Sequence, residues 1–451
     1  MRRAAWILAS ASLFIPGWAA ADAHGKLRPC AESDFTVSQF FDSLPVDLST
    51  VSGLVPLGNA NGSSHIVPIS TTYFYTAFAF GGADGHQMVP ALTDVPIQVP
   101  GDVTATGIRW EPNSGGSLFA GDDWYLDFRP CAEIRFTYHH LNAITAPHRL
   151  AARAEQIRRG IRAWCTYDDA GNATSCSGLA DVPVASGTVV GAVYRLNQVS
   201  FNLTAFDTRD ATTTPAPGAV VDPSRYELTF DELLAALAAS GAPIPRALTP
   251  ELYAELDPSR THARCPLDYF APALRDALYA KLGSFDGSVH RTVPPLCGQV
   301  FQDSTDGGLA GGWFPDGLVG TFLLDSESVL AGFLRGSVDP TTLFFSIGTS
   351  VAPSLGRTLS FPYPGFDPPG GTHNVSFDGA RFHPELADQP LFCWDGLTTA
   401  EMDGGTAFAP APVPGAMLVQ FTSPARMRFE YAPAGSCGVP AFSSAAGFFV
   451  R

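Results

Sequence analysis

Eight cysteines are spread along most of the 451-residue chain, and they constrain its fold more than any other feature. No two of them form a C-x-x-C motif, which argues against a zinc ribbon or a thioredoxin-like redox site. An even number of widely spaced cysteines is typical of structural disulfides in an exported protein. The spacing does not determine the connectivity, and we expect the cysteines to pair in chain order. The expected disulfides are Cys30–Cys131, Cys165–Cys176, Cys265–Cys297 and Cys393–Cys437.

The first 23 residues have the layout of a secretory signal peptide. Arg2 and Arg3 precede an apolar run over residues 4–15, which is too short to cross a bilayer as a stable helix. Ala21-Asp22-Ala23 is a typical cleavage motif. No later stretch has the roughly 18 consecutive apolar residues that a membrane helix needs. The sequence therefore predicts a secreted, periplasmic or otherwise extracytoplasmic protein without a membrane span.

Composition favours a mainly β protein of more than one domain. Cleavage leaves roughly 430 residues, enough for two or three domains. Hydrophobic residues make up 45% of the chain and charged residues only 16%, while 44 glycines and 38 prolines favour short strands joined by turns. The formal net charge of −16 argues against binding of nucleic acid or of an anionic membrane through a basic face.

The pattern of strands and turns divides the chain. We expect a β domain over 24–210, a linker with short helices over 211–262, and a second compact β-rich domain over 263–451. In the first domain, residues 95–99 and 103–108 predict a hairpin that turns at Pro100-Gly101-Asp102. Helices are expected over 149–162, over 230–239 behind a Thr229/Glu232 capping box, and over 272–282 with Gly283 as C-cap.

Four short motifs follow one another between residues 55 and 207. They are the segment 64–74 with His65, the expected hairpin at 95–103, the segment 134–141 ending in Tyr138-His139-His140-Leu141, and Val190-Gly191 followed by Gln198-Val199-Ser200-Phe201. In this order they resemble the motifs of the lysostaphin-like, M23-type zinc metallopeptidases. The resemblance implies a lysostaphin-like antiparallel sheet domain whose groove accepts extended peptides.

The residues that the resemblance places at the zinc site differ from those of an active peptidase. In that family a His and an Asp of the first motif and the last His of H-x-H bind zinc, and two further histidines assist. His65 matches the first ligand, but Ser70 and Ser200 replace the other two, and Gln198 replaces one assisting histidine. Only His140 matches as an assisting residue. Neutral serine oxygens are poor zinc ligands, so we expect a degenerate peptidase domain without a cofactor.

Other residues do not obviously rebuild a site. His139 and His140 are neighbours on an expected strand, so their side chains should point to opposite faces. Trp313 and Phe314, next to a glycine-rich stretch, could form an aromatic ligand platform, but the favoured interpretation is that they fill a core.

The leading hypothesis is a secreted, non-catalytic module that binds cell-wall peptide or another extended extracellular polypeptide. The first alternative is an active zinc hydrolase or peptidase with non-standard ligands, with His65 and His140 at its centre. The second alternative is a structural extracellular protein without a ligand groove. No nucleotide-binding motif and no G-x-S-x-G nucleophile motif occurs. No oligomeric state is predicted.

Overall fold

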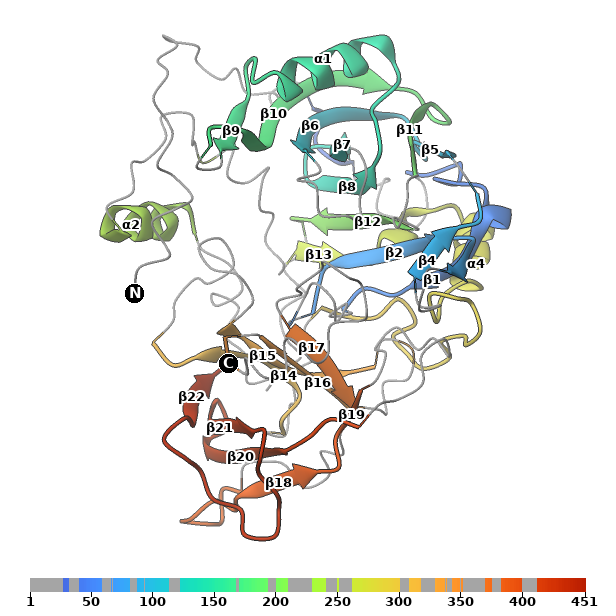
Figure 1. Cartoon of the computed structure of the whole chain (residues 1–451). Helices are drawn as coiled ribbons and strands as arrows, with labels where there is room; N and C mark the ends of the chain where they lie inside the picture. Colours follow the sequence, from blue (N-terminus) through green and yellow to red (C-terminus); the bar gives the residue numbers. More distant parts are fainter. Residues whose placement is uncertain are drawn as a thin grey trace. The chain divides into compact units, whose positions relative to one another are not determined.

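The structure is a computed structural model, and Figure 1 shows the arrangement of its helices and strands. The predicted signal peptide (residues 1–23) and residues 211–228 of the predicted linker lie outside the described residues. The structure describes residues 27–31, 40–58, 66, 68–81, 87–92, 94–112, 122–167, 170–193, 200–209, 229–240, 250, 262–300, 308–317, 329–336, 338, 343–348, 350–351, 370–374, 383–399 and 412–451.

The described residues fall into two compact units, each with its own large antiparallel sheet. The first unit comprises those within 27–54, 71–209 and 229–281, and the second those within 55–70 and 282–451. The mainly β class is therefore as predicted. The predicted domain limits differ, because residues 263–281 belong to the first unit and 55–70 to the second. Strand β13 (Ala263–Arg264) gives one reason, since it pairs with β12 (Ser200–Asp207) of the first sheet.

The sheet of the first unit has nine strands, in the order β1-β2-β12-β8-β7-β6-β10-β9 with β13 beside β12 (Figure 1). From β2 to β9 each strand pairs antiparallel with the next one in this order. Two small sheets pair β3 with β4 and β5 with β11. The bounds are β1 Val51–Val55, β2 Thr71–Thr76, β3 Phe78–Gly81, β4 Gln87–Pro90, β5 Val95–Gln98, β6 Val103–Glu111, β7 Asp123–Cys131, β8 Ile134–Leu141, β9 Trp164–Tyr167, β10 Ala173–Val184 and β11 Val189–Val193.

Alternation along the central strands gives this sheet one apolar and one polar face. In β7, Leu126 and Phe128 are fully buried, while Tyr125 and Asp127, which alternate with them, are partly exposed. Phe128 contacts Phe136 of β8 at 5.7 Å between ring centroids, and Phe136 contacts Phe41 at 4.5 Å. Because side chains on a strand alternate between the faces, the intervening residues lie on the opposite face. That second face carries the candidate site described below.

Residues 95–108 do not form the predicted hairpin. Strand β5 pairs with β11, whereas β6 pairs with β7 and β10 in the large sheet. The intervening turn is bound by the N-terminal segment, since the N–H groups of Asp42 and Ser43 both donate to the Pro100 carbonyl at 3.0 Å. A Cβ on Gly101 would lie 2.1 Å from the carbonyl oxygen of Phe40, so this close approach requires glycine. The Pro-Gly sequence marks a turn but does not determine which strands pair.

Two helices agree with their sequence signals. Helix α1 (His148–Arg158) buries Leu150, Ala154 and Ile157, and contacts β10 where Gly178 leaves no room for a side chain beside Ile157. Helix α2 (Phe230–Ser240) begins with the predicted capping box. There the Thr229 N–H donates to Glu232 at 2.7 Å and the Glu232 N–H donates to the Thr229 hydroxyl at 3.3 Å.

Helix α4 (Pro272–Tyr279) is shorter than predicted. Its C-cap is Ala280, so Gly283 does not end the helix. Gly283 instead forms an antiparallel bridge with His290, and a Cβ there would lie 1.9 Å from the Val289 carbonyl oxygen. The glycine therefore serves a close backbone contact. The described part of this unit also contains the 3-10 helices η4 at Leu48–Thr50 and η7 at Pro266–Tyr269.

The sheet of the second unit also has nine strands, in the order β18-β20-β21-β22-β14-β15-β16-β17-β19. Its neighbouring strands pair antiparallel. The bounds are β14 Gly311–Pro315, β15 Ala331–Arg335, β16 Leu343–Gly348, β17 Gly370–Asn374, β18 Phe392–Asp395, β19 Thr398–Thr399, β20 Ala416–Ser423, β21 Arg426–Ala432 and β22 Gly447–Val450.

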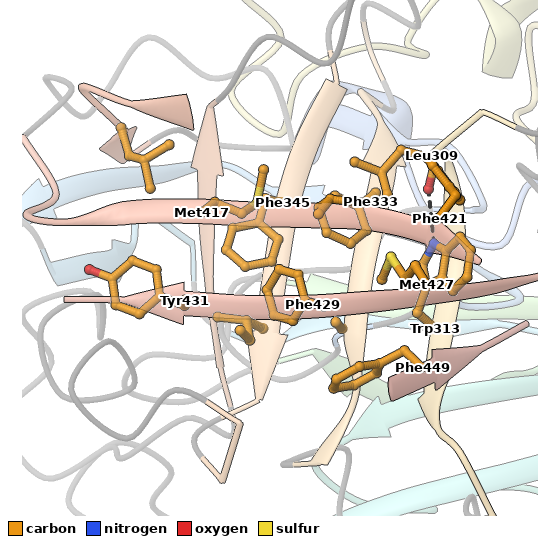
Figure 2. Close-up of a cluster of buried hydrophobic side chains, with 14 of the residues drawn as sticks. Leu309, Trp313, Phe333, Phe345, Met417, Phe421, Met427, Phe429, Tyr431 and Phe449 are labelled. Atoms are coloured by element: carbon orange, nitrogen blue, oxygen red, sulfur yellow. Dashed lines mark hydrogen bonds between the residues drawn. The ribbon is translucent and has the colours of Figure 1, made fainter. Parts of the chain in front are cut away.

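The core of the second unit contains Trp313, which settles the role of the aromatic pair in β14. Figure 2 shows Trp313 among Phe421, Met427 and other buried side chains, with its indole N–H bound to the Leu309 carbonyl at 2.9 Å. Trp313 and Phe314 are both fully buried. The core interpretation is confirmed, and the ligand-platform interpretation is wrong.

All described cysteines are in disulfides. Three of the expected pairs are present as predicted, namely Cys30–Cys131, Cys165–Cys176 and Cys393–Cys437. Cys265 and Cys297 are disulfide-bonded as well. Among the described residues, no helix is long and apolar enough to cross a membrane.

Candidate functional site

A β-bulge in strand β8 is the most unusual feature of the polar face. Trp124 of β7 is opposite Leu141 of β8, and Leu126 is opposite Tyr138. Tyr125 alone is therefore opposite two residues, His139 and His140. His140 has φ = 66°, in the left-handed region that non-glycine residues seldom adopt. Bulges of this kind redirect side chains and occur frequently beside functional sites.

The bulge places both imidazoles beside one aromatic ring. The Tyr125 ring lies 4.9 Å from the His139 ring and 5.9 Å from the His140 ring, and the two imidazoles are 6.3 Å apart. The prediction that the two histidines point to opposite faces is therefore wrong. Regular alternation fails because the extra residue shifts the pleat by one position.

Strands β6 and β7 add charged groups to the same place. Arg109 is opposite Tyr125, and Glu111 is opposite Asp123. The Arg109 guanidinium lies 4.9 Å from the centroid of the Tyr125 ring and forms an ion pair with Glu111. Asp123 Oδ2 lies 2.9 Å from His140 Nδ1. We call this group the bulge cluster: Arg109, Glu111, Asp123, Tyr125, His139 and His140.

The bulge cluster is partly accessible. The side chains of Arg109 and His140 are 43% and 32% exposed, and those of Glu111 and Asp123 are 27% and 26% exposed. Molecules from solution can therefore reach the charged groups, while the neighbouring strands restrict their movement.

Burial and the neighbouring charges set the protonation states. Burial alone would lower the pKa of His140, but the charge and hydrogen bond of Asp123 outweigh it and raise this pKa above its usual value. Burial raises the pKa of Tyr125 well above its usual value, and the negative charges of Asp123 and Glu111 add to the effect. Tyr125 is therefore a neutral phenol, and His140 keeps its proton to a higher pH than a free imidazole does.

Two buried acceptor atoms in and beside the bulge cluster are unsatisfied. Asp123 Oδ1 and Asn202 Oδ1 have no hydrogen-bond partner among the residues that the structure describes. Asn202 is only 3% exposed and is opposite His139 on one side and Tyr73 of β2 on the other. Buried polar atoms are normally hydrogen-bonded, so these oxygens mark positions where a water or a ligand donor would bind.

Two of the predicted zinc positions lie in different units of the structure. Ser200 in β12 is opposite Tyr75 of β2 in the first unit. Ser70 belongs to the second unit. The zinc site that the resemblance places at Ser70 and Ser200 therefore stays a prediction.

Two of the other predicted positions are described by the structure and two are not. His140 is in the bulge, and Ser200 lies near the same end of the sheet, since Asn202 is opposite His139. His65 and Gln198 lie outside the described residues. The zinc-ligand set that the resemblance implies therefore stays a prediction.

One other group of potential metal ligands occurs among the described residues, and it is structural. Cys30, Cys131 and Glu133 have ligand atoms within 4.8 Å of one another. The two cysteines form a disulfide, and the Glu133 carboxylate accepts the Cys30 N–H at 2.8 Å. These atoms are therefore already engaged.

Sequence reasoning missed most of the bulge cluster. Arg109 and Glu111 at the end of β6, and Asp123 and Tyr125 at the start of β7, are each two residues apart. That spacing puts each pair on one face of its strand and was the available signal. It does not reveal which strands are neighbours or how they are aligned.

Comparison of the chain with known protein families, with characterised proteins and with solved structures gives no match. The resemblance to the lysostaphin-like metallopeptidases therefore remains a sequence-based expectation.

Proposed function

We propose that this protein is an exported, non-catalytic binding module for an extended polypeptide, with cell-wall peptide as the leading candidate. The bulge cluster is the observation that carries the proposal. It combines a guanidinium, two imidazoles, two carboxylates and a phenol on one sheet face. Peptides offer both hydrogen-bond donors and acceptors, so a mixed cluster of this kind suits them.

The charge of the protein supports a peptide rather than a polyanion. The chain has a formal net charge of −16, and within the bulge cluster each carboxylate is paired with a cationic or imidazole group. Nucleic acids and anionic surfaces bind mainly through an excess of positive charge. A peptide with dispersed polar groups does not require such an excess.

Disulfides support the proposed location. Cys30–Cys131, Cys165–Cys176 and Cys393–Cys437 form and persist in oxidising compartments, which include the cell exterior and the periplasm. The signal peptide predicted from the sequence agrees with export.

The proposed function can be tested with insoluble cell-wall sacculi. The purified protein should cosediment with intact sacculi, and sacculi from which an amidase has removed the peptides should retain less of it. Tyr125→Ala should reduce cosedimentation at least about fivefold, because it removes the ring that contacts Arg109 and both histidines.

His383→Ala is the matched control, because His383 of the second unit also contacts a carboxylate, Glu385, at 3.1 Å. Equal retention of wild type and Tyr125→Ala would contradict a role for the bulge cluster. No retention by sacculi or by any peptide would favour a structural protein without a ligand.

An active zinc hydrolase with His65 and His140 at its centre is the second candidate. One observation favours it: histidines that bind a metal usually donate their other ring N–H to a carboxylate, and His140 Nδ1 lies 2.9 Å from Asp123. Elemental analysis of the dialysed protein decides between the candidates. Near-stoichiometric zinc in wild type that is lost in His65→Ala would favour the hydrolase over the binding module. Wild-type protein without zinc would contradict the hydrolase.

A further inference from the structure

We propose that the bulge cluster binds the free C-terminal carboxylate of a peptide, with Arg109, Tyr125 and His140 as hydrogen-bond donors. This inference rests on the proposed function and names the chemical group that the binding module recognises. It follows from which donor and acceptor atoms of the cluster remain available.

Arg109 is the strongest donor. A guanidinium has five N–H groups in a planar fork. Arg109 Nη2 forms an ion pair with Glu111 Oε1. The N–H groups on the other edge of the guanidinium remain available to a ligand. The Tyr125 ring, 4.9 Å from the guanidinium carbon, restricts the orientation of the plane. An oriented, half-exposed guanidinium is well suited to a carboxylate.

The phenol of Tyr125 is the second donor. Its ring lies beside Arg109 on β6 and beside His139 and His140 on β8. The raised pKa keeps the phenol protonated, so the hydroxyl is available as a donor. No hydrogen bond of this hydroxyl to another described residue occurs.

His140 adds a third donor. Asp123 Oδ2 accepts from Nδ1 at 2.9 Å, so the ring atom left for an external molecule is Nε2, which has no hydrogen-bond partner among the described residues. When the ring is protonated, Nε2 carries a hydrogen that it can donate to a carboxylate. The bulge places the His140 ring beside the Tyr125 ring.

Asp123 provides an acceptor for the amide N–H that lies next to the carboxylate at a peptide C terminus. Asp123 Oδ1 is buried and lacks a partner among the described residues. The amide N–H of a peptide's last residue lies close to its carboxylate and would satisfy this oxygen. A carboxylate together with an adjacent N–H is the signature of a peptide C terminus, whereas an internal segment lacks the carboxylate and an isolated acid lacks the amide.

Charge on the whole protein makes the recognition short-ranged. The net charge of −16 repels an anionic ligand at a distance. Attraction must therefore come from directional hydrogen bonds at contact, which a neutral carboxamide reproduces poorly because it lacks the negative charge. The expected selectivity is for the acid form of a peptide over its amide.

Isothermal titration calorimetry with the purified protein tests the proposal. The probes are acetyl-Lys-Ala-Ala as free acid and as carboxamide, each made with either two L- or two D-alanines. Wild type should bind at least one free acid about tenfold or more tightly than its carboxamide. A preference for the D form would identify cell-wall peptide as the source, and a preference for the L form would identify a polypeptide C terminus.

Arg109→Gln should reduce affinity for the free acid at least about tenfold and leave affinity for the carboxamide unchanged. Tyr125→Phe removes one oxygen atom and should reduce free-acid affinity about threefold to tenfold, which keeps the test valid if Arg109→Gln does not fold. His383→Gln is the control and should behave like wild type.

Three results would overturn the proposal. Equal affinity of wild type for acid and carboxamide would reject recognition of the carboxylate and leave the peptide-binding function standing. Binding to sacculi without binding to any of the four peptides would do the same. Failure to bind both sacculi and peptides would reject the proposed function together with this inference.

Discussion

Replacing His140 by glycine and by alanine tests the backbone geometry on which the bulge cluster depends. Both changes remove the imidazole and its contact with Asp123, so their difference reports on the backbone alone. His140 has φ = 66°. A residue with a Cβ pays about 1–2 kcal/mol in this left-handed region, and glycine does not. The same pair of changes at His139, which is not among the residues with positive φ, provides the reference.

The difference in stability between the glycine and alanine variants should have opposite signs at His139 and His140. At an ordinary strand position glycine is less stable than alanine by about 0.5–1 kcal/mol, because its unfolded chain is more flexible. We expect this order at His139. At His140 relief of about 1–2 kcal/mol of strain exceeds that cost, so His140→Gly should be more stable than His140→Ala by about 0.5–1 kcal/mol. The double difference between the two positions isolates the strain, about 1–2 kcal/mol.

The assay must report on the first unit. Pulse proteolysis in increasing urea, followed by mass spectrometry of peptides from 122–167, gives the unfolding midpoint of the segment that contains β7 and β8. All four variants are compared at one temperature and pH. If alanine is more stable than glycine at both positions by the same amount, His140 does not occupy the left-handed region, and the bulge does not orient the two imidazoles.

Three further changes test other parts of the structure. Trp313→Phe should destabilise the second unit by about 1–3 kcal/mol in urea unfolding, because it leaves the buried Leu309 carbonyl without its donor; an unchanged midpoint would contradict the core in Figure 2. Asp207→Asn should lower the free energy of unfolding by about 3 kcal/mol near pH 7, because Arg209 loses the negative charge of the buried Asp207 carboxylate. Burial alone would raise the pKa of Asp207, but its hydrogen bonds lower it, so wild type should lose this stability as pH falls below about 4. Asp207→Asn should not show this loss of stability at low pH. Identical acid unfolding curves for wild type and Asp207→Asn would contradict the stabilising role of the Asp207 carboxylate. Glu155→Gln on helix α1 should lower the free energy of unfolding by no more than about 0.5 kcal/mol in thermal unfolding, because the ion pairs of Glu155 with Arg158 and Arg159 are exposed. A decrease several times larger would contradict the exposure of these ion pairs.

Local sequence patterns predicted some of the elements and several of their details. Period-two alternation predicted β7 and β8, and the Thr229/Glu232 pair predicted the start of α2. Chain order predicted three disulfides that the structure contains, among them Cys165–Cys176. These features depend on residues close in sequence, or on cysteines whose partners follow one another along the chain.

Strand pairing was predicted less well. The apolar runs on either side of Gly101 were expected to form a hairpin, but they belong to different sheets. Pairing depends on competition between all strands for neighbours, and no local pattern describes that competition.

By itself the sequence determined the mainly β class, the positions of several strands in the first unit, the core role favoured for Trp313 and three of the disulfide pairs. Only the tertiary structure decided the composition of the bulge cluster. Arg109, Tyr125 and His140 come from three strands, and they meet because one extra residue in β8 turns His140 out of the regular alternation. A bulge forms where the best alignment of two whole strands leaves one residue over, so its position is a property of the paired sheet.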